Sequence, residues 1–399
     1  SETLRADVLQ VWNKSYPLAG KAVTGDLKIV IGDNELIYSE NSLENKINRP
    51  LIIPEEFDWN STYGLYTQGE QWMNQKYFGN AEKFLLKALD KDNCFSPALI
   101  RLASLYYREA KYHEALVLVS KALSLNAYDG EANYLYGLIN MSLERYTDAK
   151  DGFSVASYSP SYRSEAYFKL AANCIREEKW RQADDYVNKS LQYNAKNLNA
   201  LQAQLVCCRK SGNSEAFNRL SDKLSKEYPL DHFVRYERYL SQQSSSESRN
   251  LFTSLIRNEL SRETYMEISV WYEAMGCSDE AIDILSFIPD YPIACYKKAW
   301  LLNKKGETTE AMSLLGQADK LSPELVFPFR LENLQALIWA SSQSTSWKPL
   351  YYQAILRHTF REVEIASELL SKCENVDFMP FYLYRASFRS GEKCLADLL

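Results

Sequence analysis

The chain has 399 residues, of which 46% are hydrophobic and 25% are charged, and its formal net charge is −6. This composition is typical of a soluble globular protein, and the absence of any run of 18 apolar residues excludes a membrane-spanning helix. No long Lys/Arg run occurs, so the sequence argues against nucleic-acid binding, which usually needs positive charge concentrated on one face.

Residues 1–60 form an N-terminal segment that lacks the repeat found further along. The run LRADVLQVW fits a short helix, and the runs LKIVI and ELIYS are short β-type stretches around Gly32, Asp33 and Asn34. These residue types can supply the positive φ of a tight turn, so the sequence predicts a β-hairpin. A lone hairpin is marginally stable in water, and it must therefore pack on the repeats, on a partner or on preceding sequence.

Residues 61–240 carry an internal repeat with a period of 34 residues. The repeat is marked by four alanines, namely Ala81, Ala115, Ala149 and Ala183. Three more columns keep the same spacing: small residues at Gly69, Ala103, Gly137 and Ala171, aromatic residues at Phe78, Tyr112, Tyr146 and Trp180, and small residues at Ala88, Ala122, Ala156 and Ser190. Small residues let two helices approach closely, and the aromatic column fills the space beside them. One helix pair cannot bury its apolar face alone, so successive pairs must stack.

This pattern resembles the tetratricopeptide repeat, whose 34-residue helix–turn–helix unit has small and aromatic residues at these positions. The match is specific across residues 62–197 and weakens afterwards. The resemblance implies an all-α, tetratricopeptide-type α-α superhelical solenoid with a small N-terminal β-hairpin.

Residues 250–399 predict degenerate repeats of the same kind. Before this region, Ala216 marks a fifth unit within residues 61–240. Ala281 and Ala311 mark two later units, and LYYQAILRHTFREVEIASELLSKC resembles another. The serine-rich stretches 241–250 and 341–346 are expected to be loops or irregular joints, where the superhelical path changes. The run MPFYLYRASFRSG predicts a further first helix, and EKCLADLL begins a second one. Because that end offers apolar leucines instead of a polar cap, we expect the native chain to continue beyond residue 399.

A narrower resemblance joins the N-terminal segment to the repeats. The run EEFDWNSTYGLYTQGEQWM, with KIVIGDNELIYSE before it and NYLYGLIN after it, resembles the C-terminal repeat region of large uncharacterised bacterial proteins, often from Bacteroidetes. In that family a β-rich domain similar to galactose mutarotases precedes the repeats. The resemblance implies that residues 1–60 are the remnant of an upstream β domain, and that the parent protein acts on or binds carbohydrate.

The sequence contains no constellation that points to catalysis, a cofactor or a metal. Phosphate-binding, nucleophile-elbow, zinc-protease and calcium-loop motifs are all missing. The eight cysteines form no CxxC pair, and the three histidines are scattered. We therefore expect no enzyme activity from this chain, no bound metal, and buried thiols in a reducing compartment. No signal peptide is visible, so a cytoplasmic location is expected, although a signal that had been removed would leave no trace.

The candidate binding site is the concave groove that tetratricopeptide arrays form from their first helices. The fifth position of units starting at residues 62, 96, 130 and 164 gives Tyr66, Ile100, Tyr134 and Phe168, and the twelfth gives Met73, Tyr107, Met141 and Ile175. Leu138 at the ninth position and Arg108 and Arg176 at the thirteenth complete the predicted site. A clamp for acidic C-termini is disfavoured, because only the two arginines add positive charge here.

Two functions remain open at this stage. The first is a protein–protein interaction scaffold that binds a peptide or protein surface in the groove, since Tyr and Met suit adaptable recognition. The second is a helical accessory module of a carbohydrate-binding or carbohydrate-active protein, docked on its own upstream β domain. Tight superhelical packing that buries the apolar stripe internally is the structural alternative to a groove. The sequence does not indicate an oligomeric state.

Overall fold

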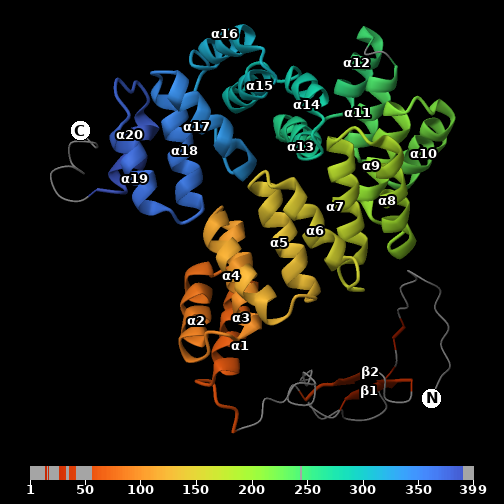
Figure 1. Cartoon of the computed structure of the whole chain (residues 1–399), viewed down its shortest axis with the longest axis vertical. Coiled ribbons are helices and arrows are strands. Elements are labelled where there is room, and N and C mark those ends of the chain that lie inside the picture. The colour runs from red at the N-terminus through yellow and green to blue at the C-terminus, as the bar shows by residue number, and fades with distance from the viewer. Residues whose placement is uncertain are drawn as a thin grey trace. The chain divides into compact units, whose positions relative to one another are not determined.

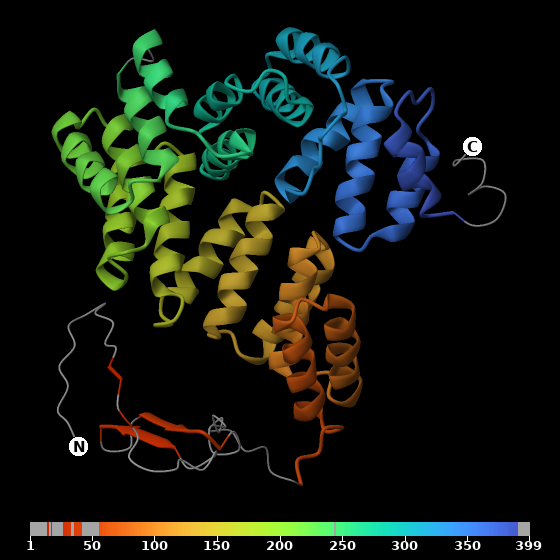
Figure 2. The ribbon, with the colours of Figure 1, turned by 180° about the vertical axis from the view of Figure 1, so that it is seen from behind.

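The computed structural model describes residues 27–32, 36–41, 56–242 and 245–389, together with residues 14, 15 and 17. The chain divides into two compact units, residues 1–58 and residues 59–399. The first unit contains a β-hairpin and the second consists of helices (Figures 1 and 2). The expected all-α architecture with a small N-terminal hairpin is therefore confirmed.

The hairpin consists of strands β1 (Lys28–Ile31) and β2 (Leu36–Ser39). They pair antiparallel, with Ile29 opposite Tyr38 and Val30 opposite Ile37. Gly32 begins the turn with a φ of 67°, the left-handed conformation expected of a glycine there. Asp33 and Asn34 of the predicted turn, and the helix expected from LRADVLQVW, lie outside the described residues.

Residues 59–399 contain twenty α-helices and one 3₁₀ helix in their described part. Six pairs come first: α1 (Thr62–Asn74) with α2 (Phe78–Lys91), α3 (Ser96–Arg108) with α4 (Tyr112–Leu125), α5 (Gly130–Ser142) with α6 (Tyr146–Ala156), α7 (Arg163–Arg176) with α8 (Trp180–Tyr193), α9 (Leu198–Lys210) with α10 (Ser214–Glu227), and α11 (His232–Ser241) with α12 (Ser246–Ser254). There follow α13 (Ser261–Ala274), α14 (Ser278–Leu285), α15 (Pro292–Lys304), α16 (Thr308–Ala318), η1 (Leu331–Asn333), α17 (Leu334–Gln343), α18 (Trp347–Thr359), α19 (Val363–Ser371) and α20 (Met379–Ala386).

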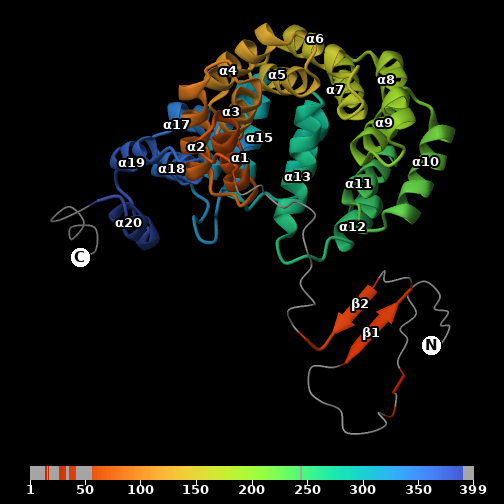
Figure 3. The same ribbon diagram turned by 90° about the horizontal axis from the view of Figure 1, so that it is seen from below.

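The helix pairs stack side by side into a curved tetratricopeptide-type solenoid. The two helices of each of these six pairs contact each other, and the second helix of each of the first five pairs contacts the first helix of the next pair. Figure 3 shows α5, α7, α9 and α11 on the inside of the curve and α6, α8 and α10 on the outside. Helix α13 lies within that curve, so the later repeats turn back towards the inner face of the earlier ones.

The small-residue columns lie at the crossing points of the paired helices, as the repeat predicts. All four marker alanines, from Ala81 to Ala183, are fully buried. A Cβ on Gly137 would lie 2.6 Å from the Phe153 ring, and one on Gly152 would lie 2.8 Å from the backbone oxygen of Asn133. Glycine therefore permits a backbone-to-backbone approach of α5 and α6 that a larger residue would prevent.

The turns inside the repeats share one left-handed residue. Lys76, Ala110, Glu144 and Glu178 have φ between 56° and 63°, and Gly212 follows at the same spacing with a φ of 73°. These residues end the first helix of each pair with a reverse turn; for example, the Lys111 amide donates to the Tyr106 carbonyl at 2.9 Å. This left-handed position was not predicted from the repeat, because its first four residues are not glycine and only the fifth, Gly212, is.

The structure corrects the expectation for the two serine-rich stretches. Residues 246–250 are not a loop but the first half of α12, and residues 341–343 are the last turn of α17. The Ser245 hydroxyl accepts a hydrogen bond from the Ser248 amide and caps α12, and Ser346 caps α18 in the same way. Serine is unfavourable inside helices but favourable at their N-termini, so a serine run at a joint can begin a helix.

Helix α17 was not predicted at all. It contacts both α15 and α18, and so adds a helix between two helix pairs. The predicted helix in MPFYLYRASFRSG is present as α20, whereas the helix expected from EKCLADLL lies outside the described residues.

We expect Gly152→Ala to destabilise the chain by about 1–3 kcal/mol, because the new methyl group would overlap the backbone of α5. Gly316→Ala is the matched control: Gly316 is also helical, but nothing lies within 4 Å of its added Cβ, so the better helix propensity of alanine should stabilise the fold by about 0.5–1 kcal/mol. Urea unfolding of both variants measures the difference. Equal effects in the two variants would contradict the close crossing.

Candidate functional site

The predicted groove residues lie along the inner helices α1, α3, α5 and α7, but they differ in exposure. The structure leaves Tyr66, Met73, Tyr107, Tyr134, Leu138, Met141 and Arg176 half-buried, leaves Arg108 exposed, and buries Ile100, Phe168 and Ile175. The stripe is therefore exposed or half-exposed in the first three repeats except at Ile100, and it is enclosed in the fourth except at Arg176.

The two tyrosines at the fifth position pack against the residue that precedes the next inner helix. The ring of Tyr66 meets Phe95 edge-on at 5.6 Å, and the ring of Tyr134 stacks on Tyr162 at 5.4 Å. Tyr134 also contacts Phe153 of α6. Each tyrosine thus fixes the angle between two repeats with one face of its ring and leaves the remainder open to solvent.

A ladder of opposite charges joins these tyrosines across three repeats. Arg101 of α3 lies 2.5 Å from a Glu70 oxygen on α1 and 3.6 Å from a Glu131 oxygen on α5. All three side chains are about one-third exposed. Burial, followed by the charge of Glu70, raises the pKa of Tyr66 to about 12, so this hydroxyl keeps its proton and remains a hydrogen-bond donor.

We call Tyr66, Glu70, Arg101, Glu131 and Tyr134 the inner strip. The repeat positions in the sequence predicted the two tyrosines of the inner strip but not its ion pairs. The spacing of the three charged residues could have indicated these ion pairs. They follow one another at intervals of 31 and 30 residues, slightly shorter than the 34-residue repeat, so each lies diagonally opposite the previous one on the neighbouring inner helix.

The two predicted arginines do not form a common anion site. Arg108 lies over the Phe78 ring, with its guanidinium carbon 5.1 Å from the ring centre. Arg176 lies over the Tyr146 ring at 4.4 Å, and it donates a hydrogen bond to the Ala274 carbonyl at the end of α13 (2.7 Å). Both arginines therefore serve contacts within the chain.

The fourth repeat is enclosed by α13. Phe168 and Ile175 belong to one buried apolar cluster with Met266 and Tyr272 of α13, and this cluster continues as far as α20. Phe233 of α11 joins it by stacking on the Tyr272 ring at 5.1 Å. The later repeats thus occupy the inner face that an external partner would otherwise contact.

A buried ionic network fixes α13 and α14 in this place. Arg209 of α9 holds Glu237 of α11 through two hydrogen bonds of 2.7 and 2.9 Å, and the Tyr272 hydroxyl donates a hydrogen bond to the same carboxylate. Arg209 and Lys210 also bind Glu280 of α14, at 3.0 and 2.5 Å. Glu237 is fully buried, so removing Arg209 alone would leave a buried charge unpaired. No local motif in the sequence indicated this network, because its members come from four helices.

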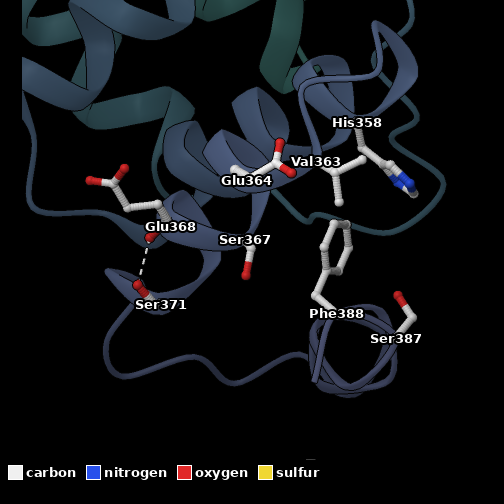
Figure 4. Close-up of a pocket in the computed structure, with 8 residues that line it drawn as sticks. All are labelled: His358, Val363, Glu364, Ser367, Glu368, Ser371, Ser387 and Phe388. Carbon is white, nitrogen blue, oxygen red and sulfur yellow. Dashed lines mark hydrogen bonds between the residues drawn. The ribbon is translucent and has the colours of Figure 1, made fainter. Parts of the chain in front are cut away.

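A shallow cavity of about 680 Å³ lies near the C-terminal end of the described chain (Figure 4). The outer face of α19, including Glu364 and Ser367, lines one side, and His358 and Phe388 line another. His358 contacts the Tyr384 hydroxyl through its Nδ1 atom at 2.8 Å. The hydroxyls of Ser371 and Ser387 donate hydrogen bonds to the backbone carbonyls of Glu368 and Tyr384.

The thiols of the described residues are mostly buried within helices. Burial raises the pKa of Cys207 to about 12 and that of Cys277 to about 12, which keeps both thiols protonated and unreactive. Within the described residues, no group of three His, Cys, Asp or Glu side chains is placed to hold a metal ion. None of the helices in that part of the chain is long and apolar enough to cross a bilayer.

We expect Glu280 to contribute stability that is lost in acid. Burial alone would raise its pKa, but the hydrogen bond from Lys210 and the charge of Arg209 outweigh burial and lower it. Stability from a lowered carboxylate pKa is present above the ordinary value of about 4.3 and is lost as the pH falls through the folded-state value. Denaturant unfolding of the parent and Glu280→Gln should therefore differ most near neutral pH and converge in acid. A difference that stays constant from about pH 7 to about pH 3 would contradict this role.

Comparison with known proteins finds similarity of fold and little similarity of sequence. No protein-family model matches the chain. A stretch of 126 residues is 29% identical to Protein NPG1 of Arabidopsis thaliana; it covers 30% of this chain, and the chain spans only 18% of the length of that relative. A tetratricopeptide repeat protein of Parabacteroides merdae aligns with 76% of this chain and 98% of its own, at 15% identity and a TM-score of 0.42. The C-terminal part of a TPR repeat-containing protein of Cytophaga hutchinsonii aligns with 68% of this chain and 99% of its own, at 15% identity and a TM-score of 0.40. Similarity at this level does not extend to function, and the tetratricopeptide-type architecture stands on the paired helices of this chain.

Proposed function

We propose that this chain is a protein-interaction scaffold that binds a peptide or protein segment along the inner strip. The observation that carries the proposal is the continuous row of half-exposed aromatic and charged side chains across α1, α3 and α5. Tyrosine and arginine are the residue types that contribute most at protein interfaces. The role assigned to these residues is binding and not catalysis.

The chemistry of the strip favours a segment that combines apolar and basic side chains. Glu70 and Glu131 flank the single cation Arg101, and both carboxylates reach solvent. A lysine or arginine of the partner can pair with either carboxylate, while an apolar neighbour covers the exposed part of Tyr66 or Tyr134. Half-exposed ion pairs contribute specificity and association rate more than affinity, so the aromatic contacts should dominate the binding free energy.

We expect synthetic peptides that alternate Lys with Phe or Leu to bind the full chain more tightly than matched peptides with Glu in place of Lys. Tyr66→Ala should weaken binding of the basic peptides about tenfold or more, since an interface tyrosine that matters contributes above about 1.4 kcal/mol. Glu131→Lys should weaken the same peptides by placing like charges together. Fluorescence anisotropy measures both effects.

Arg219→Glu is the control for a change of charge, because Arg219 is exposed on the outer helix α10. It should leave the affinity for the peptides unchanged. Equal affinity for basic and acidic peptides, or no effect of Tyr66→Ala, would contradict binding at the inner strip.

The hairpin favours a second candidate function, that of a helical accessory module docked on a β-sheet domain of a carbohydrate-binding protein. Apart from the charged Lys28, the exposed side chains described in its strands are apolar, namely Ile29, Val30, Ile31, Ile37 and Tyr38, and Leu27 beside β1 is exposed as well. Two strands are too few for a stable sheet in water, and they would gain stability by joining a larger one.

In the chain alone, we expect the backbone amides of β1 and β2 to exchange with deuterium far faster than those of the buried helices. The physical reason is that an isolated pair of four-residue strands opens locally at little cost. Hydrogen exchange followed by mass spectrometry measures this. Amides of β1 and β2 that were protected as well as those of α7 would show that the hairpin needs no added sheet.

A further inference from the structure

The turns within the repeats form a row along one edge of the solenoid, and the later turns contact the earlier ones. Lys304, at the end of α15, pairs with Glu144 in the turn after α5 at 2.9 Å. Arg361, in the turn between α18 and α19, pairs with Glu109 after α3 and with Glu82 of α2, both at 2.6 Å. Figures 1 and 2 both show the ends of α18 and α19 beside those of α2 and α4. We call these three ion pairs the turn seam.

The turn seam is polar, whereas the neighbouring contact between α7 and α13 is apolar. One buried cluster holds Phe168 of α7 and Met266 of α13 together and extends to Phe381 of α20. Among the described residues, no buried apolar cluster joins α1–α6 to α13–α20; α1–α5 form two clusters of their own, and a third cluster joins α6 to α7. The first three repeats are therefore joined to the last ones by charges, and to α7 by repeat stacking.

The three ion pairs of the seam are unequal. The side chains of Lys304 and Glu144 are 47% and 64% exposed, and pairs of this kind contribute little. Glu109 is only 4% exposed, and one guanidinium bridges it to Glu82. Charge-assisted hydrogen bonds to a buried carboxylate are strong, although Lys111 also contacts Glu109 at 2.8 Å. Arg361 is thus the residue on which closure depends most.

We propose that the turn seam is a reversible latch: α1–α6 swing as an arm away from α15–α19, and Arg361 holds the arm closed. The stacked repeats give the arm rigidity, and the connection between α6 and α7 is where it meets the apolar core. Burial is the main cause of the raised pKa of Tyr107 and Tyr112, and the charge of Glu332 of η1 adds a smaller part. Opening would uncover the end of the inner face near Tyr107. The opening itself does not depend on the proposed function. Only the entry of a larger partner through the opened edge rests on that function.

Small-angle X-ray scattering of the full chain without any ligand tests the latch. Between about 0.1 M and about 1 M salt the screening length falls from about 10 Å to about 3 Å, which weakens the exposed Lys304 pair and also the pairs of Arg361, whose side chain is 34% exposed. We expect the radius of gyration of the parent to rise with salt. Arg361→Glu should give the large value already at low salt, with an unchanged helical circular dichroism signal.

Two further variants make the result specific. Lys372→Glu makes the same charge change on α19, but Lys372 pairs with Glu368 of its own helix, so this variant should behave as the parent. Adding Glu82→Arg to Arg361→Glu restores one pair with reversed charges and should return the radius of gyration towards the parent value. If Arg361→Glu lost its helical signal, the salt titration of the parent would decide. A radius of gyration that neither salt nor Arg361→Glu changes would overturn the latch.

Discussion

The whole solenoid depends on the close crossing of two helices within each repeat. These crossings need small residues, as Gly137, Gly152 and the four buried marker alanines show. The crossing fixes the geometry of a pair, but a pair still has an apolar face to bury. That face is buried by the next pair, so one local constraint, repeated along the chain, generates a curved stack with a distinct inner face.

The later repeats also have apolar surfaces, and these must be buried against another part of the chain. From α7 onwards the chain buries these surfaces against itself. Helix α13 lies inside the curve, and its aromatic rings pack with those of α11 in one buried cluster. The network of Arg209, Glu237 and Glu280 pairs charges that this enclosure buries. The first three repeats keep their inner strip half-exposed, and this division separates the structural part of the inner face from the part available to a partner.

Apolar and polar contacts therefore have different roles in this fold. The continuous cluster from α7 to α20 does not depend on salt, and it gives the chain a permanent core. The contacts of α1–α6 with the last repeats include three ion pairs, whose strength depends on ionic strength and on how far each carboxylate is buried. A scaffold built in this way combines a fixed body with an arm whose position responds to its surroundings.

The sequence by itself determined the repeat, its 34-residue period, the small residues at each crossing and the hairpin, because all of these arise from local spacing. It also placed Tyr66 and Tyr134 on the inner face, since residues at one position of successive repeats share one face. Only the tertiary structure decided that Phe168 and Ile175 are enclosed, that α17 adds a helix, and that Arg361 reaches Glu82 and Glu109. These features depend on how the superhelix turns back on itself. That path is the sum of small rotations between repeats and leaves no periodic signal in the sequence.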